Sequence, residues 1–140
     1  MATKKQITRQ METSVKRIRE INRKIDRYRD RFEKNLAKAN KKFGLNVGVN
    51  DLMKEERGNA NYTWVEYSLP EAIRDIIGFK ESYRITSTYH SMEENIRQRD
   101  AEQRNHQRLQ SEWARLEMKA KEEANRPENA TVTAFVHPRS

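Results

Sequence analysis

The sequence contains no cysteine and, among its 140 residues, only three prolines and four glycines. The absence of cysteine excludes disulfide bonds, thiolate catalysis and metal sites with sulfur ligands. The three histidines lie far apart, and no Walker, dinucleotide-binding or nucleophile-elbow motif occurs. We therefore expect a non-enzymatic protein with no catalytic residues, no cofactor and no metal.

Long hydrophobic runs are also missing, so no segment is predicted to span a bilayer. The first ten residues contain no apolar core of a secretory signal, and we expect a cytoplasmic protein with no membrane partner. Hydrophobic residues make up 34% of the chain and charged residues 36%, against about 45–50% and about 25% in typical domains. This balance favours narrow apolar seams between helices over a thick globular core.

Residues 5–43 contain neither glycine nor proline, and their apolar residues recur every three or four positions. The seam consists of Ile7, Met11, Val15, Ile18, Ile21, Ile25, Tyr28, Phe32, Leu36, Ala39 and Phe43. This spacing predicts one uninterrupted, coiled-coil-like helix of about five heptads that ends at Gly44.

Residues 44–81 predict a compact α/β insert, because aromatic, β-branched and turn-forming residues replace the helical pattern. The expected order is a short strand at 45–49, a helical turn at 51–54, a turn at 58–59, a strand at 62–67 and a helix at 70–77 closed by Gly78. A second long helix is predicted at 82–126, ended by Pro127.

Together these elements predict a mainly α fold, in which two long helices form an antiparallel coiled-coil-like hairpin with a small α/β insert at the turn. We expect residues 1–126 to form a single elongated helical-hairpin domain and residues 127–140 to form a flexible C-terminal tail.

In the register that we expect, Phe32 lies opposite about residue 93. This register places the polar stretch 93–108 of the second helix against the middle of the first seam, which carries three isoleucines. Each isoleucine left in water forfeits roughly 1.5–3 kcal/mol of burial, so we predict that a partner protein or a second copy of the chain covers them. The residues of this predicted interface are Ile18, Ile21 and Ile25.

Positive charge is concentrated at the start of the chain, where residues 1–43 hold 15 Lys and Arg against 5 Asp and Glu. Seven of these cations recur at helical spacing and share one flank: Arg17, Lys24, Arg27, Arg31, Lys34, Lys38 and Lys41. Such a stripe suits an acidic partner, either nucleic acid or an acidic protein groove. The simpler alternative is a face that is merely solvated.

Six aromatic residues lie in and beside the insert: Tyr62, Trp64, Tyr67, Phe79, Tyr83 and Tyr89. They could stack nucleic-acid bases or bind a peptide, but the favoured interpretation is that they form the core of the insert and the junction. Strand alternation turns either Tyr62 with Trp64 or Val65 with Tyr67 outward. We include Trp64 in the predicted protein interface.

The first hypothesis is a non-enzymatic nucleic-acid-associated protein that binds the phosphate backbone through the basic face of its first helix. The second is a helical-hairpin adaptor or inhibitor that binds a partner protein, on an acidic or nucleic-acid-binding groove. A third is a purely structural coiled-coil spacer. The first two differ in whether the bound material is nucleotide or polypeptide.

Overall fold

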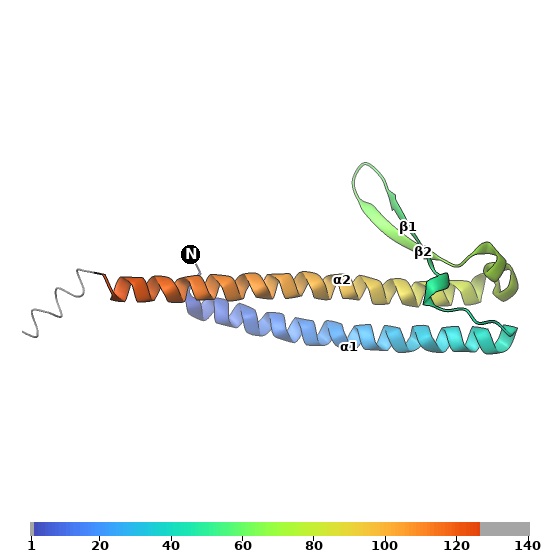
Figure 1. Ribbon diagram of the computed structural model, residues 1–140, viewed down its shortest axis with the longest axis horizontal. Coiled ribbons are helices and arrows are strands. Elements are labelled where there is room, and N and C mark those ends of the chain that lie inside the picture. Colours follow the sequence, from blue (N-terminus) through green and yellow to red (C-terminus); the bar gives the residue numbers. More distant parts are fainter. Residues whose placement is uncertain (1, 127–140) are drawn as a thin grey trace, which may run out of the picture. The chain divides into compact units, whose positions relative to one another are not determined.

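The computed structural model describes residues 2–126 and is mainly helical, as predicted. Its elements are helix α1 (Lys4–Phe43), a short 3-10 helix η1 (Val49–Asp51), strands β1 (Met53–Gly58) and β2 (Thr63–Ser68), and helix α2 (Glu71–Ala124), shown in Figure 1. The tail predicted at 127–140 lies outside the described residues.

The chain divides into two compact units, and α1 and α2 each contribute a segment to both. The central unit comprises Arg19–Asp100, and the terminal unit comprises the described residues on either side of it, 2–18 and 101–126. The division falls within the stretch where an apolar seam was expected to meet a polar one.

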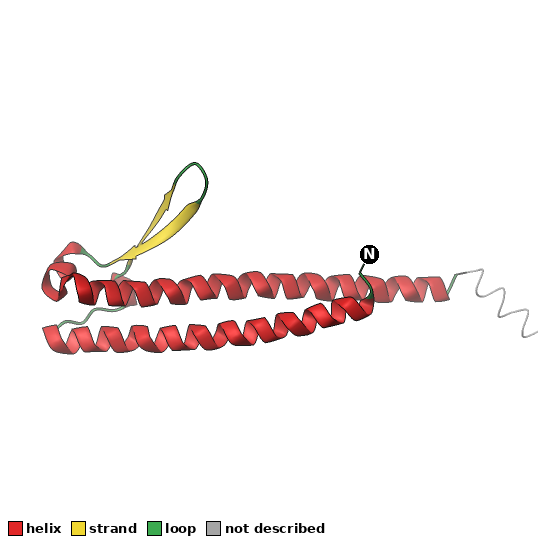
Figure 2. Cartoon of the chain, turned by 180° about the vertical axis from the view of Figure 1, so that it is seen from behind, coloured by secondary structure: helices red, strands yellow, loops and turns green. Residues whose placement is uncertain are grey.

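Within each unit the two helices pack antiparallel (Figure 2). In the central unit the rings of Phe32 and Tyr89 lie 5.0 Å apart, and in the terminal unit Lys4 forms an ion pair with Glu117. The predicted helical hairpin is therefore confirmed. The predicted register was wrong by about one helical turn, because Phe32 packs against Tyr89 and not against residue 93.

Helix α1 ends where the sequence predicted, since Gly44 follows it with a positive φ of 65°. Residues 45–49 do not form the strand that was expected there. The Asn40 side chain instead accepts a hydrogen bond from the Val47 amide at 2.8 Å and donates one to the Val47 carbonyl at 3.0 Å. These bonds satisfy the backbone groups that a neighbouring strand would otherwise have paired.

Strands β1 and β2 form an antiparallel hairpin in which Arg57 lies opposite Trp64. The predicted strand at 62–67 is confirmed with a shift of one residue, and the chain reverses just after Gly58. Strand β1 was missed. The helical turn expected at 51–54 was wrong, because η1 overlaps that span only at Asp51 and β1 begins within it at Met53.

Helix α2 contains one break, at Gly78, where φ is 86° and ψ is 166°. The short helix predicted at 70–77 is therefore confirmed as the first turns of α2. The long helical part resumes directly after Gly78, a few residues before the predicted start at 82, and ends at Ala124.

The core of the central unit lies where the end of α1, the connecting loop and the start of α2 meet. Its buried residues are Phe32, Ala39, Val47, Leu69, Ile77 and Ile85. Farther along α1, Ile25 is only 1% exposed, so the expectation that this isoleucine is left in water was wrong. Ile18 and Ile21 are half-buried, and their role in an interface stays a prediction.

Candidate nucleic-acid interface

The basic ribbon, defined as the seven cations predicted on one flank of α1, is exposed at every position. Six of its members, from Lys24 to Lys41, belong to the central unit, and Arg17 belongs to the terminal unit. Because α1 is a single helix from Lys4 to Phe43, the helical spacing of the seven cations does place them along one flank of one continuous helix.

Carboxylates neutralise very little of the basic ribbon. Within the described residues, its one ion pair joins Lys34 to Asp30 of the same helix at 2.9 Å. Asp26 interacts instead with Arg29, which lies outside the ribbon, at 3.5 Å. The guanidinium of Arg31 lies 5.8 Å from the centre of the Tyr28 ring, a contact that leaves its charge in place. The ribbon therefore presents uncompensated positive charge to solvent.

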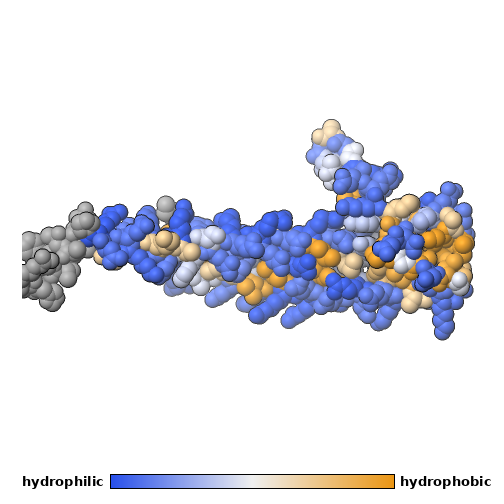
Figure 3. All heavy atoms as spheres, in the orientation of Figure 1, coloured by the Kyte–Doolittle hydropathy of each residue, from blue (hydrophilic) through white to orange (hydrophobic). Residues whose placement is uncertain are grey.

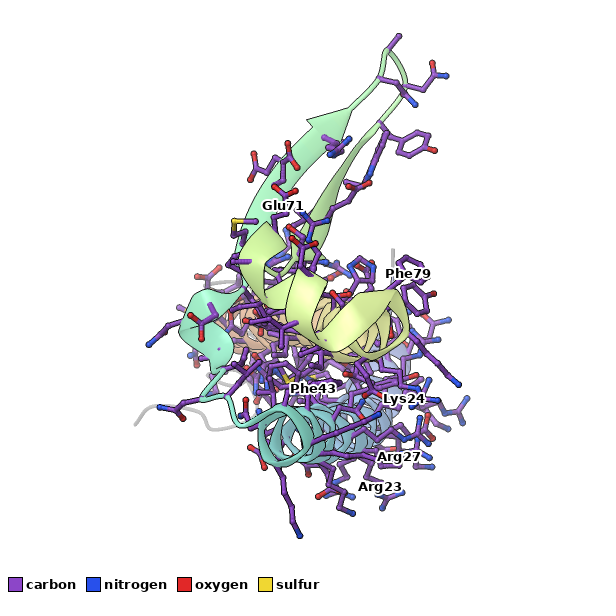
Figure 4. The ribbon with its side chains drawn as sticks, turned by 90° about the vertical axis from the view of Figure 1, so that its right-hand side faces the viewer. Arg23, Lys24, Arg27, Phe43, Glu71 and Phe79 are labelled. Atoms are coloured by element: carbon purple, nitrogen blue, oxygen red, sulfur yellow. The ribbon has the colours of Figure 1, made fainter. Side chains whose placement is uncertain are left out.

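Figure 4 shows how the middle of the basic ribbon projects from α1. Lys24 and Arg27 extend away from the packed helices on one side, and Arg23 extends with them. These three cations surround a shallow surface hollow together with Glu20 and Asp26. Sequence reasoning missed Arg23, although its position four residues before Arg27 places it on the same part of the helix surface.

Arg17 lies in a different setting, in the terminal unit. It lines a hollow of about 360 Å³ with Arg9 of α1 and with Glu102 and Arg108 of α2. Arg108 also lies 3.4 Å from Glu112 and 2.9 Å from the side-chain oxygen of Asn105. Positive charge thus gathers here as well, partly matched by carboxylates.

The aromatic cluster separates into three groups, and only one of them packs at the junction as expected, while the other two are exposed. Tyr67 of β2 packs on Tyr89 of α2 with ring centres 4.9 Å apart, and Tyr89 in turn contacts Phe32. Burial in this stack, with the Glu93 carboxylate close by, raises the pKa of Tyr89 to about 12. This group joins the hairpin to both helices.

The second group lies on the hairpin, where Tyr62 and Trp64 face outward with exposed fractions of 63% and 37%. The indole N–H of Trp64 donates to a Glu66 carboxylate oxygen at 3.0 Å. This arrangement resolves the alternation that the sequence left open, because Val65 and Tyr67 are the partly covered pair.

A cleft of about 730 Å³ separates the hairpin from α2, with Trp64 and Arg57 on one wall and His90, Glu94 and Arg97 on the other. Arg97 and Glu94 form an ion pair at 2.6 Å, and this hydrogen bond lowers the pKa of Glu94. Arg57 is similarly paired, with Glu66 at 2.9 Å. The cleft therefore combines an aromatic ring with balanced charges of both signs.

The third group is Phe79 and Tyr83 at the start of α2, exposed to 84% and 61%. Their rings are stacked, with centres 6.0 Å apart and planes inclined by 17°. Figure 3 shows hydrophobic side chains gathering around this end of the central unit. In the end-on view of Figure 4, Phe79 points to the same side as Lys24 and Arg27.

In the part of the chain that the structure describes, no three His, Asp or Glu side chains are grouped so that they could hold a metal ion. Neither long helix contains, within the same residues, an apolar stretch sufficient to cross a bilayer. The chain matches no known protein family, no curated protein and no solved structure.

Proposed function

We propose that this chain is a non-enzymatic nucleic-acid-associated protein that binds phosphates through the basic ribbon of α1. The observation that carries the proposal is that six of the seven ribbon cations have no carboxylate partner among the described residues, although each is exposed. Ordinary surface cations on helices are often paired with acids one turn away, as Lys34 is with Asp30.

The length of the ribbon suits an extended polyanion. From Lys24 to Lys41 the helix rises by about 26 Å, at about 1.5 Å per residue. A nucleic-acid strand carries one phosphate per about 3.4 Å in a duplex, so a contour of several phosphates lies within reach of these cations. Each contact would release condensed counterions, which makes binding favourable and dependent on salt.

The chemistry of the ribbon supports binding without base recognition. Lysine acts as a point charge, and phosphate contacts position a protein without reading sequence. Within the central unit the ribbon holds four lysines and two arginines, so we expect similar affinity for different base sequences.

The test is a charge reversal within the ribbon, Lys24→Glu, Arg31→Glu and Lys38→Glu together. A matched control reverses three exposed cations on other elements, Lys54→Glu, Arg104→Glu and Lys121→Glu, so that the net charge changes by the same amount. We expect the ribbon variant to lose nucleic-acid binding and the control to keep most of it, measured by fluorescence anisotropy with labelled oligonucleotides. Equal losses of affinity in the two variants would show that binding depends on net charge and not on the ribbon, which would contradict the proposal.

The cleft beside Trp64 favours a second candidate, a helical-hairpin adaptor or inhibitor that binds a partner protein. A concave site with an aromatic ring and balanced charges is typical of peptide recognition, and the free edges of β1 and β2 could pair with an extended segment. A complex that survives nuclease treatment and contains only polypeptide would favour this candidate over the first.

A further inference from the structure

Phe79 and Tyr83 are unusual because they leave a large aromatic surface in water. Phe79 is the most exposed large hydrophobic residue in the described part of the chain, at 84%. Burying such a ring would stabilise the fold, yet this ring stays exposed. Exposed apolar patches of this kind commonly mark binding sites.

Positive charge accompanies the aromatic pair. Lys80 lies between Phe79 and Tyr83 in the sequence, is exposed, and has no ion pair within the described residues. The side-chain amide of Asn35 donates to the Arg84 carbonyl at 3.4 Å. Because the helices are antiparallel, Lys38 therefore lies close to the level of residue 81, the position midway between Phe79 and Tyr83 in the sequence.

The aromatic pair and the basic ribbon also share a side of the central unit. Figure 4 places Phe79, Lys24 and Arg27 on the same side of the packed helices. Residues seven apart on a helix keep nearly the same direction, so Arg31 and Lys38 follow Lys24, and Lys34 and Lys41 follow Arg27. A ligand that runs along the ribbon toward the end of α1 therefore approaches the two rings.

This combination of cations and exposed rings distinguishes between forms of nucleic acid. Unpaired bases stack favourably on aromatic side chains, largely regardless of sequence, while a positively charged track binds the backbone. A duplex keeps its bases stacked on one another inside the helix and offers only phosphates to the ribbon. The aromatic pair can therefore increase the affinity for a single strand but contributes little to the binding of a duplex.

We propose that the Phe79–Tyr83 pair is a base-stacking platform at one end of the basic ribbon, and that the preferred ligand is single-stranded nucleic acid. The inference rests on the proposed function and narrows its substrate class. Charge complementarity favours single-stranded nucleic acid as the ligand, because its phosphates can bind the cations while its exposed bases stack on the rings.

The experiment compares Phe79→Ala/Tyr83→Ala with wild type, using a labelled 20-nucleotide single strand and a duplex of the same length at one fixed salt concentration. We expect the double variant to bind the single strand at least about tenfold more weakly, because about 1.4 kcal/mol corresponds to tenfold. Its affinity for the duplex should stay within about twofold. Tyr62→Ala, which removes an exposed aromatic ring from the hairpin, is the matched control and should change neither affinity.

The outcomes separate this inference from the proposed function. If wild type binds both ligands through the ribbon and the double variant loses neither affinity, or loses both equally, the platform is refuted while the proposed function stands. If wild type binds neither ligand, both proposals fail. A third arm uses vesicles containing phosphatidylserine, and vesicle binding that depends on Phe79 and Tyr83, without any effect on single strands, would assign the pair to an anionic membrane surface instead.

Discussion

At Gly78 the backbone adopts a conformation that residues other than glycine can adopt only with strain. Its φ of 86° and ψ of 166° lie in a region that is essentially restricted to glycine. An added Cβ would meet no atom within 4 Å there, so any cost of a side chain is conformational and not steric against the rest of the fold. The break lets the short helical start of α2 place Ile77 in the core.

Gly78→Ala should therefore lower the free energy of unfolding by about 1–3 kcal/mol. Gly48→Ala is the matched control, because Gly48 has an extended φ of −132° and is also free of atoms within 4 Å of an added Cβ. The control should be nearly neutral, or stabilising by up to about 1 kcal/mol through the unfolded state. Urea denaturation of the two variants measures the difference, and equal costs would show that the strain at Gly78 is not important.

The exposure of single residues could be predicted in part. The positions of the ribbon cations followed from helical spacing alone, and each one is exposed as that spacing required. The burial of Ile25 could not be predicted, because it depends on the register between α1 and α2, and the periodicity of one helix does not set that register. A shift of one turn is enough to cover a side chain that was expected to be in water.

At the scale of elements, the two long helices were predictable because their composition, spacing and end signals all agree. Strand β1 was not, because its sequence MKEERG lacks the apolar alternation and β-branched residues that indicate strands. It pairs because the neighbouring strand β2 supplies the aromatic and β-branched residues. The strand predicted in the loop after α1 was wrong for a related reason. Hydrogen bonds from the Asn40 side chain fix this loop, and residue spacing does not reveal them.

The packing of the hairpin on the helices has a measurable pH dependence. Burial holds the pKa of Tyr89 at about 12, above its ordinary value of 10.0. The folded state thus keeps a proton that the unfolded state releases, so this contribution to stability is complete below pH 10 and is lost as the pH rises toward 12. Stability should fall across this window.

Tyr89→Phe removes this titration while keeping the ring contacts with Phe32 and Tyr67. We expect the free energy of unfolding of wild type to fall more steeply between pH 10 and pH 12 than that of the variant. Tyr62→Phe, at an exposed position on the hairpin, should follow wild type. Chemical denaturation at a series of pH values provides the comparison, and parallel curves for wild type and Tyr89→Phe would show that Tyr89 is not held in its neutral form by the fold.

At the scale of the whole molecule, the net charge of +8 is concentrated in one helix and is not spread over the surface. Residues 1–43 carry 15 basic and 5 acidic side chains, and among the described residues only Lys34 of the ribbon has an ion-pair partner. Helix α1 is continuous from Lys4 to Phe43, and six of the seven ribbon cations have no ion-pair partner among the described residues.

The salt dependence of single-strand binding tests this account most directly. If six ribbon cations each engage one phosphate, the logarithm of the association constant should fall with the logarithm of salt concentration with a slope of about −4, at about −0.7 per phosphate contact. The variant with Lys24→Glu, Arg31→Glu and Lys38→Glu should show a much smaller slope, whereas the off-ribbon control should keep that of wild type. A wild-type slope near zero, or one that the ribbon variant retains in full, would contradict the claim that the ribbon binds phosphates.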